Sequence, residues 1–145
     1  MRDNDGLQRF LSAQEGDYET ARKELQAGRK RSHWMWYIFP QVSGLGFSSM
    51  SGYYGIKGLK EAEAYLQHPV LGARLLEITK VLLNISSADA TAIFGSPDDL
   101  KLRSCMTLFR QVPGSSAVFQ QVLDKFFSGE PDQNTLRILA HSDPA

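Results

Sequence analysis

Apolar residues recur every three or four positions along most of the chain, which is the spacing of amphipathic helices. The first such stripe runs from Leu7 to Leu25, and Gly28 follows where a helix commonly ends. Gly16 and Asp17 are the point at which this helix could break in two. The pattern predicts helix, in one or two pieces, over residues 7–25.

The second half of the chain repeats this pattern, and proline and glycine separate the helical stretches. The clearest start signal is Ser96 as N-cap with Pro97 in the first turn, followed by two aspartates that suit the positive end of a helix. Ser87 is the expected cap of the short helix before it. The predicted helices cover residues 59–67, 69–82, 87–95, 96–112, 115–129 and 131–139.

The segment from Arg29 to Gly55 has no such periodicity. An aromatic run is followed by Pro40 and by several glycines among serines, which predicts a long irregular loop. Loops of this length in a compact domain are often functional. Since no stretch alternates like a strand, we expect an all-α fold: one domain over residues 1–145, a bundle of about seven helices with one long irregular loop.

Composition narrows the function classes. Hydrophobic residues make up 42% and charged residues 22%, as in ordinary globular proteins. Sixteen basic and sixteen acidic residues give no net charge, which makes nucleic acid an unlikely partner because such binding depends on phosphate neutralisation. RNA binding is kept as a minor hypothesis, since aromatic residues beside basic ones suit base stacking.

Cysteine and histidine usage predicts neither a disulfide nor a metal site. Cys105 is the single cysteine, and the three histidines lie far apart without ligand spacing. No cofactor is expected. The polar start of the chain and an apolar run of only 34–39 predict a cytoplasmic protein without a membrane segment.

The sequence GRKRSHWMWYIFPQ at 28–41 resembles the bacterial family called domain of unknown function 1810. Further segments agree with that resemblance: Arg9 and Phe10 with Ala13 and Gln14, residues 44–46, Glu61 and Ala62, Tyr65 and Leu66 ending at His68, and residues 93–95 followed by 98–109. The resemblance implies a compact multi-helical domain and no established activity. Relatives more often look to have serine at position 105, which argues against a cysteine nucleophile.

The label calpastatin-like, which such proteins sometimes carry, does not fit this chain. That inhibitor is a disordered, repeat-bearing polypeptide, whereas the composition here is that of a globular domain. We therefore set the label aside.

The loop holds the first group of candidate site residues. His33, next to three cations, would stay neutral and could act as a base, or it could be a half-buried histidine bonded to a carbonyl. The tryptophans could stack on a ligand or fill the core, and the cations could meet a phosphate or lie on a solvated helix end. The candidate ligand-binding residues in this segment are Arg29, Lys30, Arg31, Trp34, Trp36 and Gln41.

The helix after Ser96 holds the second group. Its apolar residues surround most of its circumference, so we expect a central helix whose charges need partners. Asp99 is a candidate acid or base, although a salt bridge with Arg103 is the simpler interpretation. Lys101 and Ser104 could bind an anion, unless the Ser104 hydroxyl bonds back to the helix.

These groups lead to the hypothesis that residues 29–54 fold over the central helix and bring Arg31, His33 and Gln41 toward Asp99 and Lys101. The expected function is binding of an anionic or nucleotide-like small molecule, with or without catalysis by His33 and Asp99. The alternative is a protein-interaction module with Trp34, Trp36 and Phe39 as exposed anchors. A pocket would favour the first hypothesis and a flat apolar patch the second.

Overall fold

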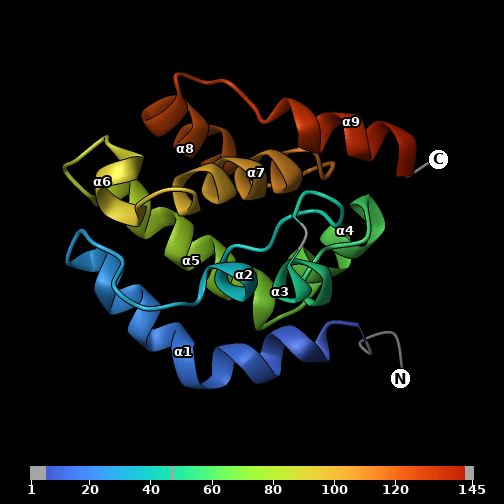
Figure 1. The fold of residues 1–145 in the computed structure, drawn as a ribbon, viewed down its shortest axis with the longest axis horizontal. Coiled ribbons are helices and arrows are strands. Elements are labelled where there is room, and N and C mark those ends of the chain that lie inside the picture. The colour runs from blue at the N-terminus through green and yellow to red at the C-terminus, as the bar shows by residue number, and fades with distance from the viewer. Residues whose placement is uncertain (1–5, 47, 143–145) are drawn as a thin grey trace.

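The computed structural model describes residues 6–46 and 48–142, and within these ranges it has nine helices and no strand (Figure 1). One isolated bridge joins Val42 and Ile56. The all-α class is confirmed. In chain order the helices are α1 (Gln8–Gln26), α2 (Met35–Ile38), α3 (Ser49–Tyr53), α4 (Leu59–Gln67), α5 (Leu71–Asn84), α6 (Ala90–Phe94), α7 (Asp98–Arg110), α8 (Val118–Phe127) and α9 (Gln133–Ser142).

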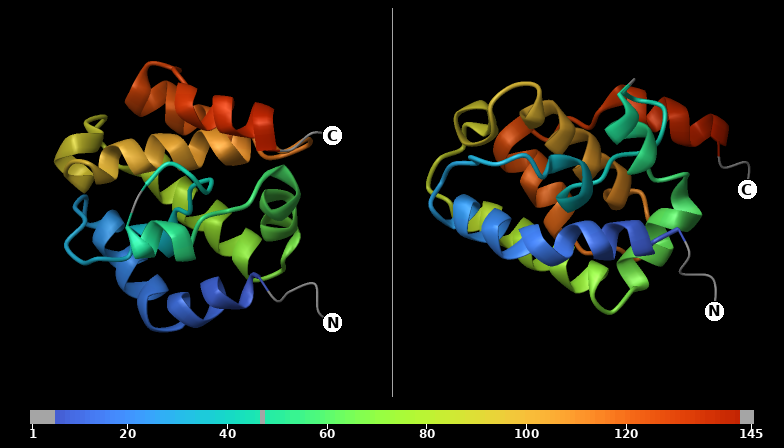
Figure 2. Two further views of the ribbon diagram at one scale, coloured as in Figure 1. Left: turned by 45° about the vertical axis from the view of Figure 1, so that its right-hand side comes forward. Right: turned by 60° about the horizontal axis from the view of Figure 1, so that its bottom comes forward.

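Helices α5 and α7 form the centre of the bundle. α5 contacts α1, α4 and α8, while α7 contacts α4, α6, α8 and α9. Figure 1 and the left view of Figure 2 show α1 and α9 on opposite sides with these two helices between them. Leu102, Met106 and Phe109 of α7 are fully buried, so the prediction of a central helix after Ser96 is confirmed.

Seven of the nine helices are the predicted ones, and the other two, α2 and α3, are short turns of helix inside the irregular segment. Of the two alternatives for residues 7–25, a single helix is the one found, because α1 runs through Gly16 and Asp17 without interruption. Gln14 and Tyr18 on either side of Gly16 are both buried, and their packing outweighs the weak helix propensity of one exposed glycine.

Two caps differ from the prediction. Pro97 is the N-cap residue of α7, and no side chain caps that end, so Ser96 does not have the expected role. Asp89 rather than Ser87 caps α6, since its side chain accepts the N–H of Ala92 at 3.1 Å. The Ser87 hydroxyl instead accepts the N–H of Asp89, in the turn that precedes α6.

The irregular segment is held to the bundle by its backbone. Gly28 has a φ of 87°, a conformation that favours glycine, and it turns the chain away from α1. The N–H of Lys30 then donates to the carbonyl of Ile93 on α6 at 2.8 Å. No helix in the described residues has the length and apolar character needed to cross a membrane.

Candidate functional site

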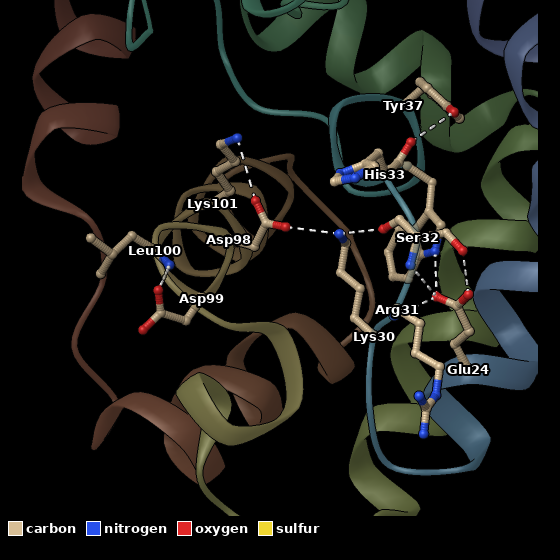
Figure 3. Close-up of polar contacts among 11 residues, drawn as sticks. Glu24, Lys30, Arg31, Ser32, His33, Tyr37, Asp98, Asp99, Leu100 and Lys101 are labelled. Atoms are coloured by element: carbon tan, nitrogen blue, oxygen red, sulfur yellow. Dashed lines mark hydrogen bonds and ion pairs between the residues drawn. The ribbon is translucent and has the colours of Figure 1, made fainter.

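The carboxylate of Glu24, near the end of α1, organises the start of the loop (Figure 3). It accepts the N–H groups of Arg31 and Ser32 at 2.8 and 3.1 Å and the Ser32 hydroxyl. It also accepts the indole N–H of Trp34 at 2.9 Å. Burial alone would raise the pKa of Glu24, but these hydrogen bonds favour the ionised form more strongly and lower the pKa to about 2.

Lys30 crosses from this loop to α7. Its side chain is only 6% exposed, and its ammonium lies 2.9 Å from an Asp98 oxygen. The same ammonium donates to the Ser32 carbonyl and lies 5.0 Å from the centre of the Trp34 ring. The middle cation of the basic cluster is therefore used inside the protein, to fix the loop on α7.

Asp98 is shared between two lysines. Its Oδ2 faces Lys30, and its Oδ1 lies 3.4 Å from the ammonium of Lys101 (Figure 3). Two ammonium groups and one carboxylate leave this cluster with one excess positive charge. The ion pair of Lys101 with Asp98 is longer than that of Lys30, and the Lys101 side chain is 24% exposed whereas that of Lys30 is 6% exposed. The excess positive charge is therefore available to an incoming anion at Lys101.

Lys101 lies beside an open space that we call the α7 hollow. This space has a volume of about 370 Å³ and lies between the loop, the first turns of α7 and the start of α9. The half-buried Trp36 holds its ring 4.8 Å from the Lys101 ammonium, and it borders a smaller adjoining recess. The polar residues that line the hollow are Gln41, Ser51, Lys101, Ser104, Asp132 and Asn134, and the apolar ones are Leu45, Pro97 and Leu100.

The structure brings together four of the predicted residues. Gln41 and Lys101 line the hollow from its two sides, Ser104 lies one turn further along α7, and Trp36 contacts Lys101. The Ser104 hydroxyl donates to the Leu100 carbonyl at 3.2 Å, which is the alternative that the sequence left open. Its oxygen can still accept a hydrogen bond from a ligand.

Asp99 lies apart from this group. It is buried, and its oxygens accept the Thr91 hydroxyl at 2.6 Å and the N–H of Leu100 at 2.9 Å. It does not line the α7 hollow. The expected salt bridge to Arg103 is wrong, because the Arg103 guanidinium donates to the Glu130 carbonyl instead.

Three further predicted residues face solvent. Arg29 and Arg31 are exposed, and Figure 3 shows the Arg31 side chain pointing away from Lys101, so Arg31 does not approach Lys101 as expected. His33 is also exposed, not half-buried, and in the described part of the chain no hydrogen bond holds its imidazole. The catalytic roles assigned to His33 and Asp99 stay predictions.

Two of the three proposed anchor side chains are buried. Trp34 is 1% exposed and Phe39 is fully covered, so neither can be the exposed anchor that a protein-interaction surface at this place would require. Cys105 is buried as well, and burial raises the pKa of its thiol well above the ordinary value.

Three acidic residues of the site were not candidates from the sequence. Glu24 binds groups seven to ten residues further along the chain, which no helical spacing would reveal. Asp98 lies at the start of a predicted helix, and this position accounts for an acidic residue there without indicating Lys30 or Lys101 as its partner. Asp132 lies at the start of the last predicted helix, and that position alone does not indicate a carboxylate that faces a ligand.

Two further hollows hold none of the predicted residues. One of about 530 Å³ lies beside Arg9 and Tyr53, and another of about 270 Å³ lies between Leu66 and Phe119. Within residues 6–46 and 48–142, no group of three or more histidine, cysteine or acidic side chains is placed to hold a metal ion.

Comparison with known proteins gives a family for the chain. The model of the family described as protein of unknown function DUF1810 matches residues 4–139. The crystal structure of the conserved hypothetical protein Rv1873 from Mycobacterium tuberculosis is 46% identical, with a TM-score of 0.92, and the match covers 95% of this chain and 99% of that one. No curated protein matches the sequence. The chain belongs to the DUF1810 family.

Proposed function

We propose that this protein binds a small anionic molecule, such as a phosphorylated metabolite, in the α7 hollow. The observation that carries the proposal is the position of Lys101, which adds an incompletely compensated ammonium to the wall of the hollow. Asp98 already serves the buried Lys30, so its charge is divided between two lysines.

The surroundings of Lys101 favour an anion over water alone. The Trp36 ring lies 4.8 Å from the ammonium, and contact with an aromatic face holds a cation in place. Ser104 and Gln41 add neutral hydrogen-bonding groups nearby. At about 370 Å³ the hollow falls within the range of about 300 to 1,000 Å³ typical of small-molecule sites.

The test is a thermal-shift screen of the purified protein against nucleotides, sugar phosphates and small dicarboxylates, followed by calorimetric titration of the hits. A ligand that binds the native state raises the melting temperature. The Lys101→Met variant keeps the length of the side chain and removes its charge. Loss of a charged hydrogen bond is worth about 1.5 to 3 kcal/mol, so we expect its affinity to fall about ten- to a hundredfold.

Lys80→Met is the matched control, because Lys80 is an exposed lysine on α5 outside the hollow. This variant should bind like the wild type. The proposal is wrong if no anion in the panel shifts the melting temperature, or if Lys101→Met binds the hits as tightly as Lys80→Met does.

A further inference from the structure

Asp132 is held rigidly at the α9 end of the hollow. Its Oδ2 accepts both the N–H and the hydroxyl of Thr135, at 2.8 and 2.6 Å. Its own N–H donates to the hydroxyl oxygen of Thr107 on α7 at 2.9 Å. Both threonines are fully buried, so the position of Asp132 is set by the core of the bundle.

The second carboxylate oxygen of Asp132, Oδ1, does not take part in holding the start of α9. Among the described residues no hydrogen bond to Oδ1 is formed, and Asp132 lines the hollow. A carboxylate oxygen is an acceptor and never a donor when ionised. It therefore suits a ligand that offers hydroxyl groups at this end.

The spacing along α7 separates this acceptor from the cation. Thr107, which holds Asp132, lies six residues after Lys101, or about 9 Å along the helix axis. Ser104 lies between the two and contributes a neutral hydroxyl. The hollow thus has a positive end, a neutral middle and a negative end.

We infer that the ligand of the α7 hollow is a sugar phosphate, with its phosphate at Lys101 and its hydroxyl groups donating to Asp132. This inference rests on the proposed function and gives it a substrate class. A phosphorylated pentose or hexose carries its charge at one end and hydroxyl groups along the rest of the molecule, which is the order of groups that the hollow presents. A dicarboxylate does not match, because its second carboxylate would face Asp132 and be repelled.

The test compares four probes by calorimetric titration: ribose 5-phosphate, inorganic phosphate, ribose and succinate. With the wild type we expect ribose 5-phosphate to bind more tightly than each of the other three. Asp132→Asn keeps the cap of α9, since asparagine is an equally good N-cap residue. It should weaken ribose 5-phosphate about tenfold, leave inorganic phosphate within about twofold and improve the binding of succinate.

Asp124→Asn is the control, because Asp124 is an exposed acid on α8 that does not line the hollow. If Asp132→Asn binds ribose 5-phosphate like the wild type, or if wild-type protein prefers succinate, the sugar phosphate inference is overturned while anion binding at Lys101 stands. If none of the anions binds to the wild type, both proposals fail. The comparison among probes needs no variant, so an unstable Asp132→Asn protein would not leave the inference untested.

Discussion

Trp34 and Trp36 are two residues apart, and each has a lysine against its ring, yet their surroundings differ. Trp34 is buried, its N–H is bound by Glu24, and the lysine above it is paired with Asp98. Trp36 is half-buried at the edge of open space, and Lys101 beside it has only a share of Asp98.

Polar groups that only hold the loop in place and polar groups that could bind a ligand therefore occur side by side in this segment. Around Trp34 the polar groups of the protein satisfy each other, which fixes the loop and leaves little for a ligand. Around Trp36, Lys101 shares its one paired carboxylate with Lys30 and lies beside an open hollow. An incompletely paired charge beside open space, rather than the presence of tryptophan and lysine, marks the candidate site.

The largest effect should come from truncating the two rings. Trp34→Ala removes a fully buried aromatic side chain and should lower the free energy of unfolding by about 3 to 5 kcal/mol. Trp36→Ala removes a half-buried one and should cost about 1 to 2 kcal/mol. Urea unfolding followed by circular dichroism measures both, and equal losses would contradict the contrast between the two rings.

The next effect should come from Glu24→Gln. An amide cannot accept hydrogen bonds from four donors as a carboxylate does, so some of these donors, three of them in part-buried hydrogen bonds, lose their partner. We expect the free energy of unfolding to fall by about 2 to 3 kcal/mol at neutral pH. Glu15→Gln, at an exposed position of the same helix, should change it little.

The stabilisation from Glu24 also depends on pH in a definite direction. Its pKa is about 2 in the folded protein against an ordinary value of 4.5, so the unfolded chain takes up this proton first. The contribution is complete above about pH 4.5 and is lost as the pH falls toward 2. Stability of the wild type should therefore fall more steeply across this window than that of Glu24→Gln; parallel curves would show that the loop does not depend on this carboxylate.

The smallest effect distinguishes the two lysines that share Asp98. Lys30→Met should cost about 1 kcal/mol, because the buried ammonium is bound to both Asp98 and the Ser32 carbonyl. Lys101→Met should cost less than about 0.5 kcal/mol, as for a partly exposed ion pair. Thermal denaturation without ligand measures both, and a larger loss for Lys101 would make its role structural.

Much of the fold could be predicted from periodicity. The six longer helices each bury a stripe of apolar residues. The five-residue α6 could be predicted from the turn residues that flank it, and Gly95, with a φ of 76°, ends it as expected. Helices α2 and α3 have four and five residues, too few for a 3.6-residue period to show. The N-cap residue of α6 could not be predicted either, because Asp89 and Ser87 are both good capping residues and only the geometry of the turn selects one.

The site could be predicted only in part. The aromatic and basic loop and the central helix meet, as the hypothesis required, and Gln41, Lys101 and Ser104 line one hollow. The orientation of each cation could not be predicted, because it depends on partners distant in sequence: Lys30 pairs with Asp98, far along the chain. Consecutive cations look equivalent in a sequence, but only Lys30 turns inward here.

The position of Asp98 has a consequence for how quickly a ligand would exchange. The carboxylate acts as a permanent internal competitor for Lys101, so an entering anion must displace a group that remains one turn away. When the ligand leaves, Asp98 takes its place at once and no bare cation is left behind. For the proposed anion we therefore expect modest affinity and rapid release.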